Sequence, residues 1–106
     1  MVVYRSVDAW TALADPTRRR IFELVAARPR AVGALAELVP VTRPAVSQHL
    51  KILKSTGLVL DRAEGTRRIY RADPAGLEEL RAELDRFWNQ ALANFKQLVE
   101  HTEEDP

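Results

Sequence analysis

Apolar residues along this chain recur mainly at intervals of three and four, the spacing of helices that bury one face. The spacing predicts a short helix over residues 7–14, with Ser6 as its N-cap, and a longer helix over residues 16–28. Asp15 and Pro16 mark the start of the longer helix. A carboxylate there accepts from free backbone N–H groups, and proline already has the helical φ angle. The first quarter of the chain is therefore expected to form two consecutive helices.

Two further helices are predicted close together in the middle of the chain. Residues 32–39 carry apolar side chains at helical spacing before Pro40, and Thr42 is expected to cap a helix over residues 43–55, with Pro44 in its first turn. Two short helices joined by a turn of about three residues are typical of a helix-turn-helix.

The remainder of the chain predicts a hairpin and one long helix. Gly57 favours a helix stop, and the β-branched and aromatic residues on both sides of "AEGT" predict two strands that turn at Glu64 and Gly65. A helix of about 26 residues is expected from Asp73–Pro74 to Glu100, followed by an acidic, disordered tail over 101–106. We therefore predict one domain over residues 1–100, mainly α with a small β-hairpin.

The last helix is apolar over an arc of about 140°, wider than the roughly 100° that packing on one core requires. The surplus apolar surface predicts a homodimer in which a second copy covers the first and last helices. The residues expected at this interface are Trp10, Leu13, Leu84, Phe87, Trp88, Ala91, Leu92 and Phe95.

Charge is unevenly distributed along the chain, although the net charge is only +1. Residues 1–72 contain 13 Lys and Arg against 6 Asp and Glu, whereas residues 73–106 contain 3 against 9. A basic segment of this kind favours binding to a polyanion such as nucleic acid. A solvated basic surface without a partner is the alternative.

Several classes of chemistry are not expected from the composition. The chain has no cysteine, so it offers no disulfide, thiolate metal site or cysteine nucleophile. It has no Gly-rich phosphate loop, and Ser47 and His49 lie about 160° apart around a helix, too far to form a nucleophile and base. No apolar run approaches the roughly 20 residues of a membrane span, and no signal peptide is evident. We expect a cytoplasmic protein that is not an enzyme, needs no cofactor and contacts no membrane.

The helix over 43–55 has two distinct faces. Val46, Leu50 and Leu53 form an apolar stripe, and the opposite side carries Gln48 and Lys51. Such a helix fits the major groove of DNA, where an amide pairs with adenine and lysine meets phosphate. An ordinary solvated helix face is the alternative. His49 lies beside the stripe and is expected to pack rather than to contact a base.

The hairpin is unusually basic around its tip, with Arg62, Arg67, Arg68 and Arg71. A thin basic hairpin suits contact with a phosphate backbone or a narrow minor groove. Charges that block strand addition at a sheet edge are the alternative explanation.

The segments "ALADPTRRRIFELV", "VGALAELVPVTRPAVSQHLKILKSTGLV" and "AEGTRRIYR" resemble the ArsR/SmtB family of winged helix-turn-helix transcriptional regulators. The resemblance implies a homodimer that places one helix in the major groove of double-stranded DNA and the hairpin, or wing, on flanking DNA. The positions that match the family's DNA-contacting residues are Thr42, Arg43, Ala45, Ser47, Gln48 and His49 on the helix and Arg67 and Arg68 on the wing. The helix face and the hairpin charge add Lys51 and Arg62 to these candidates.

The resemblance also bears on metals and effectors. Family members that sense metals use cysteines or Asp and His ligands, whereas this chain offers only His101 and Glu104 near its end. It therefore resembles the branch without a metal site, in which the effector is often unknown. We expect a repressor that binds an inverted-repeat operator. The alternative is a winged-helix module that has lost DNA binding and joins other proteins.

Overall fold

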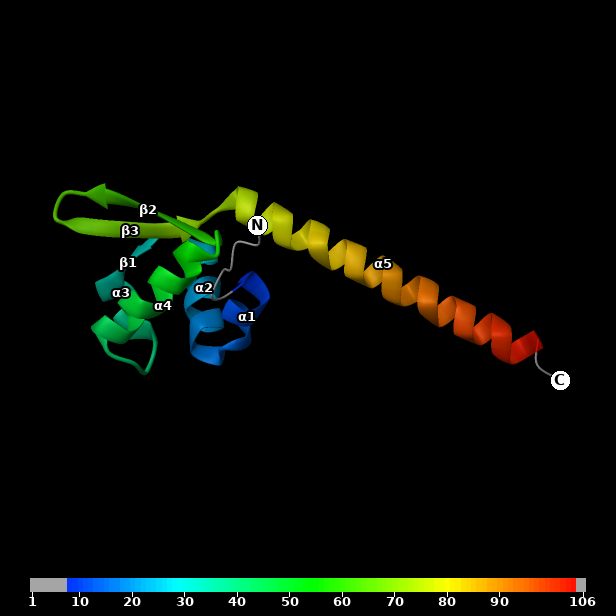
Figure 1. Cartoon of the computed structure of the whole chain (residues 1–106). Coiled ribbons are helices and arrows are strands. Elements are labelled where there is room, and N and C mark those ends of the chain that lie inside the picture. The colour runs from blue at the N-terminus through cyan, green and yellow to red at the C-terminus, as the bar shows by residue number, and fades with distance from the viewer. Residues whose placement is uncertain (1–7, 105–106) are drawn as a thin grey trace, which may run out of the picture.

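The computed structural model describes residues 8–104 and contains five helices and a three-stranded sheet within them. The elements are α1 (Ala9–Ala14), α2 (Pro16–Ala27), β1 (Arg30–Ala31), α3 (Val32–Leu38), α4 (Arg43–Ser55), β2 (Val59–Glu64), β3 (Arg67–Ala72) and α5 (Pro74–Glu104). Helices α1 to α4 gather beside the β2–β3 hairpin, and α5 extends away from them (Figure 1). The predicted class, mainly α with a small β-hairpin, is confirmed.

Local capping explains where the helices begin. The Arg18 backbone N–H donates to Asp15 Oδ1 at 2.9 Å, and the Ala45 N–H donates to Thr42 Oγ1 at 3.3 Å, so both predicted caps are confirmed. The first helix starts at Ala9 rather than residue 7, because Asp8 accepts from the Thr11 N–H at 2.7 Å. The predicted cap Ser6 lies outside the described residues.

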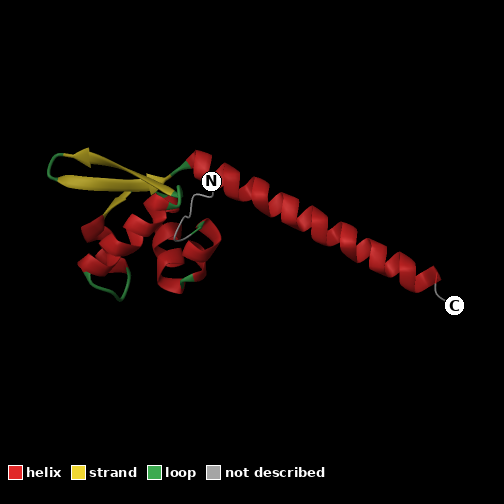
Figure 2. Ribbon diagram, viewed as in Figure 1, coloured by secondary structure: helices red, strands yellow, loops and turns green. Residues whose placement is uncertain are grey.

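The sheet is antiparallel with the order β1-β3-β2 (Figure 2). Glu64 pairs with Arg67, so the hairpin turns at Gly65 and Thr66 rather than at Glu64 and Gly65. Gly65 has a φ angle of +62°, which glycine adopts without steric cost. Strand β1 was not predicted, because two residues are too short to show an alternating pattern.

One hydrophobic core lies between the helices and the base of the hairpin. Its largest fully buried side chains come from α2, α3, α4 and the segment that enters β2: Ile21, Val25, Leu35, Val46, Leu50, Leu53, Leu58 and Val59. The buried Thr56 hydroxyl donates to the Leu53 carbonyl at 2.9 Å, so the end of α4 buries no unpaired hydroxyl. Helices α3 and α4, which form the helix-turn-helix, thus pack into one shared core.

Helix α5 contacts this core only at its beginning. Leu77 and Leu80 pack against the core, and the rest of the helix projects outwards (Figure 1). Its 31 residues correspond to a length of about 46 Å, and the protein extends 70 Å along its longest axis. The helix continues four residues beyond the predicted end at Glu100, so residues 101–104 of the expected disordered tail are helical. Within the described residues, no helix combines the length and the apolarity that crossing a membrane requires.

The start of α5 lies directly against the loop that follows α4. The Asp73 N–H donates to the Leu58 carbonyl at 2.9 Å, and Gly57 adopts a φ angle of +81°. A methyl group at Gly76 would overlap the Gly57 carbonyl oxygen. Only glycine at position 76 permits this approach of the two backbones.

This contact predicts different effects for two Gly→Ala substitutions in helices: a loss of stability at Gly76 and little change at Gly33. Gly76→Ala should lower the free energy of unfolding by about 1–3 kcal/mol, because the backbone at the junction must shift. Gly33→Ala is the matched control: its new methyl would meet only the flexible Arg43 guanidinium, so helix propensity should offset the contact. Urea unfolding followed by circular dichroism measures both changes. Equal stability of the two variants would contradict the close approach at Gly76.

Candidate nucleic-acid interface

Helix α4 separates its apolar and polar faces as the spacing predicts. Val46, Leu50 and Leu53 are fully buried, whereas Gln48 and Lys51 are exposed. Of the other predicted DNA-contacting residues on this helix and its cap, three are exposed and two are half-buried. The exposed ones are Thr42, Arg43 and Ser47, and the half-buried ones are Ala45 and His49. The buried stripe anchors the helix, which leaves its polar face free for a partner.

His49 is half-buried beside the apolar stripe of α4. Its Nδ1 atom is buried and has no hydrogen-bond partner among the described residues. The pKa of Asp15 is lowered mainly because the Arg18 backbone N–H donates to its carboxylate, and the nearby charges of Arg18 and His49 lower it further. His49 on α4 therefore lies near Asp15, the N-cap of α2.

Arg43 lies in a cleft between the helix-turn-helix and the wing. Its guanidinium lies so close to Gly33 that a methyl group there would be 2.9 Å from Nη2. The cleft has a volume of about 310 Å³ and is bordered by three arginines. Its lining residues are Ala31, Val32, Gly33, Ala34, Arg43, Thr66, Arg67 and Arg68. The first turn of α4 and the tip of the wing thus share one basic concave surface.

Strand register places the wing arginines on two faces of the hairpin. Leu60 pairs with Arg71 and Glu64 pairs with Arg67, so these side chains share one face with Arg62. Ala63 pairs with Arg68, which places Arg68 on the other face. The four wing arginines are therefore not equivalent, although the sequence gives all four a similar basic setting.

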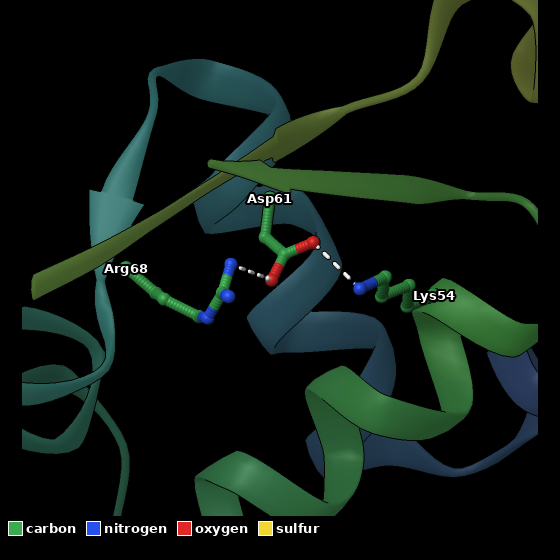
Figure 3. A network of polar contacts seen from close by, with 3 residues as sticks. All are labelled: Lys54, Asp61 and Arg68. Atoms are coloured by element: carbon green, nitrogen blue, oxygen red, sulfur yellow. Dashed lines mark hydrogen bonds and ion pairs between the residues drawn. The ribbon is translucent and has the colours of Figure 1, made fainter. Parts of the chain in front are cut away.

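Asp61 joins the wing to the end of α4 (Figure 3). Lys54 Nζ lies 2.8 Å from Asp61 Oδ1, and Arg68 Nη1 lies 3.0 Å from Asp61 Oδ2. The Asp61 side chain is only 7% exposed, whereas both cations are more than half exposed. The hydrogen bond from Lys54 lowers the pKa of Asp61 most, burial opposes this, and the Lys54 and Arg68 charges lower it further.

Asp61 was not among the functional residues predicted from the sequence. The available signal was that Asp61, unlike Glu64, occupies the same face of the hairpin as the apolar residues Val59 and Tyr70. The pairing of Arg68, a predicted DNA contact, with Asp61 was likewise not predicted.

The lowered pKa of Asp61 predicts a specific pH dependence of folding. Because ionised Asp61 is favoured in the folded protein, its stabilising contribution is present above its ordinary pKa of 3.8 and is lost as the pH falls through the lower folded value. Asp61→Asn should therefore cost about 1 kcal/mol at pH 7. The difference from the unsubstituted protein should shrink below about pH 4. Urea titrations of both proteins between about pH 3 and 7 measure this difference, and a constant difference across the range would contradict the assignment.

Most of the residues predicted at the dimer interface, on α1 and α5, are exposed and form an apolar face. Among the predicted dimer residues, Phe87 is 67% exposed, Phe95 64% and Trp88 58%. Trp10, Leu84, Ala91 and Leu92 are also exposed, whereas Leu13 is half-buried and packs against the core. A cavity of about 390 Å³ opens between α1 and α5, lined by Trp10, Glu83, Leu84 and Phe87.

No group of three or more metal-ligating His, Asp or Glu side chains occurs in the part of the chain that the structure describes.

A helix-turn-helix packed against a basic antiparallel hairpin defines the class of winged helix-turn-helix proteins. Comparisons with known proteins agree with this class. A family model described as a helix-turn-helix domain matches residues 13–62. The chain is 58% identical over 106 residues to the HTH-type transcriptional regulator Rv2034 of Mycobacterium tuberculosis, and the match covers 99% of each chain.

Solved structures extend the comparison to the fold. An ArsR-like transcriptional regulator from Rhodococcus sp. RHA1 superposes with a TM-score of 0.70 at 34% identity, covering 84% of this chain and 87% of that one. The homodimeric winged helix-turn-helix DNA-binding domain of Mb0332 from Mycobacterium bovis, a possible ArsR-family regulator, gives a TM-score of 0.62 at 31% identity. That match covers 85% of this chain and 92% of the domain. The chain belongs to the ArsR family of winged helix-turn-helix transcriptional regulators.

Proposed function

We propose that this regulator is a homodimeric repressor that binds an inverted-repeat operator in double-stranded DNA. The observation that carries the proposal is the exposed polar face of α4, held by a fully buried stripe and placed beside a basic wing. A dimer that occupies its operator represses transcription by excluding other proteins from the same DNA. Its place of action is the cytoplasm, where the chromosome of a bacterium lies.

Residues on α4 are proposed to divide the work of recognition. Gln48 projects away from the buried stripe and contacts base edges in the major groove, because its amide both donates and accepts. Lys51 lies further along the same exposed face and meets phosphate. Thr42, Arg43, Ala45 and Ser47 form the groove-facing first turns, and His49 supports the helix from its side.

The wing is proposed to contact DNA beside this groove. Arg62 and Arg67 lie on the face of the hairpin opposite Asp61 and Arg68. Arg67 also lines the basic cleft together with Arg43. Arg62 approaches Glu64 only at 3.7 Å and both side chains are more than half exposed, so that pair holds it weakly. These arginines supply affinity for phosphate more than preference for sequence.

A second copy of the chain is proposed to cover the apolar face of α5. The face continues the stripe of Leu77 and Leu80, which already packs on the core, and its remaining large side chains are unpartnered among the described residues. An exposed apolar surface of this extent marks an interaction site. The solved homodimer of Mb0332 supports this assignment. Two-fold symmetry would then place the two α4 helices in successive major grooves about 34 Å apart, with half-sites about 10 base pairs apart.

The dimer is tested by the mass of the protein in solution. Sedimentation at micromolar concentration should give about twice the 12.0 kDa chain mass. The double variant Phe87→Asp and Phe95→Asp should be monomeric, because each subunit would have to bury two unpaired carboxylates in the interface. Leu38→Asp is the matched control, since Leu38 is 51% exposed on α3, away from α5. A monomeric unsubstituted protein would refute the proposed dimer.

DNA recognition is tested first by selecting bound fragments from random DNA with the purified protein. The selected fragments should contain an inverted repeat. Gln48→Ala should then cost about 1–3 kcal/mol per half-site on the selected operator and almost nothing on random DNA, with the salt dependence unchanged.

Lys51→Ala is the companion variant on the same helix face. It should weaken binding to operator and random DNA alike and flatten the dependence of log K on log salt by about 2 units per dimer. Equal losses for Gln48→Ala on both DNAs would show that α4 only positions the protein. A protein that selects no DNA would favour the protein-binding module.

A further inference from the structure

Lys54 and Arg68 stand at the border of the proposed DNA surface, yet both are engaged within the chain. Lys54 belongs to the last turn of α4, whose polar face is proposed to enter the major groove, and Arg68 lines the cleft shared with Arg43. Both are charge-paired with the nearly buried carboxylate of Asp61, at 2.8 and 3.0 Å (Figure 3). One anion thus engages two cations that are otherwise within reach of solvent.

This arrangement differs from the other acidic contact in the wing. Glu64 is 54% exposed and lies 3.7 Å from Arg62, so solvent and salt screen that pair. Asp61 is shielded from solvent, and each of its carboxylate oxygens has its own cationic partner. Charge-assisted hydrogen bonds of this length are the stronger kind.

The location of the pairing has a consequence for DNA binding. A free surface cation meets phosphate in any sequence, so it raises affinity for operator and random DNA equally. A cation already paired with a carboxylate neutralises less phosphate charge when the protein binds, so fewer counterions leave the DNA. Its contribution to this sequence-independent affinity is therefore smaller. The same carboxylate bridges the last turn of α4 to both strands of the hairpin, which fixes the angle between the helix and the wing.

We propose that Asp61 is a positioning residue that sets the specificity of this regulator by withholding Lys54 and Arg68 from the DNA backbone while it holds the wing against α4. The inference rests on the proposed binding of DNA. It assigns the acidic residue a role in limiting affinity for random DNA, and it makes Arg68 a structural partner of Asp61 rather than a free phosphate contact.

The test uses the full chain with the Asp61→Asn substitution and compares binding to the selected operator and to a random duplex at several salt concentrations. Asparagine keeps the size and one acceptor but removes the charge, so both cations are released. Affinity for random DNA should rise by at least about fivefold at 0.1 M salt. The slope of log K against log salt should steepen by up to about 3.6 units per dimer, for four released cations. The ratio of operator to random affinity should fall.

Two control variants separate this effect from net charge and from side-chain size. Glu23→Gln makes the same charge change on the exposed side of α2, where Glu23 forms no ion pair among the described residues, and should leave both affinities within about twofold. Asp61→Glu keeps the carboxylate and should retain the low affinity for random DNA.

A triple variant with Lys54→Gln, Asp61→Asn and Arg68→Gln tests whether Lys54 and Arg68 contact DNA in the unsubstituted protein. It removes both cations together with their carboxylate, so no unpaired charge is left behind. Its salt slope should equal that of the unsubstituted protein, because these cations are already withheld from DNA. This measurement decides the matter even if Asp61→Asn alone does not fold.

Three results would overturn the inference. Asp61→Asn binding random DNA no more tightly than the unsubstituted protein would show that the cations are not withheld. A flatter slope for the triple variant would show that they already meet phosphate. If the unsubstituted protein binds neither DNA, the proposed function fails together with this inference, whereas the first two results overturn the inference alone.

Discussion

The contact between the backbones of Gly76 and Gly57 constrains the rest of the structure. It joins the loop after α4 to the first turn of α5, and the hydrogen bond from Asp73 to the Leu58 carbonyl secures the same junction. Because no side chain intervenes, the direction of α5 is fixed relative to the helix that is proposed to contact bases. In a dimer built on α5, the separation of the two α4 helices would follow from this junction, and so would the spacing of the half-sites.

Helix α4 contributes one face to the core and the opposite face to the candidate interface. Three residues of α4 are fully buried in a core that also holds α2, α3 and the base of the hairpin. The polar face therefore has no freedom to rotate without exposing Leu50 and its neighbours. Asp61 extends this rigidity to the wing, since its contacts with Lys54 and Arg68 connect α4 to both strands. A rigid helix and wing suit recognition of a duplex whose own geometry is regular.

Helix boundaries were largely predictable because capping is local. The Asp15–Pro16 and Thr42–Pro44 starts appear in the structure as predicted, since a cap and the N–H groups it accepts from lie within three residues. The differences arise where the signal was weak or not local. Strand β1 is too short to show a period and exists because β3 pairs with it. The C-terminal end of α5 lies beyond the prediction because acidic residues are compatible with either a helix or a tail.

The sequence by itself determined the class of fold, the two faces of α4 and the surplus apolar surface of α5, because each follows from the period of side chains along one helix. Tertiary structure decided which charges remain available. The four wing arginines look alike in the sequence, yet strand register places Arg68 opposite the others and beside Asp61. It also decided that Leu13 packs on the core while Trp10 stays exposed. These outcomes depend on contacts between segments distant in the chain, and side-chain periodicity carries no information about such contacts.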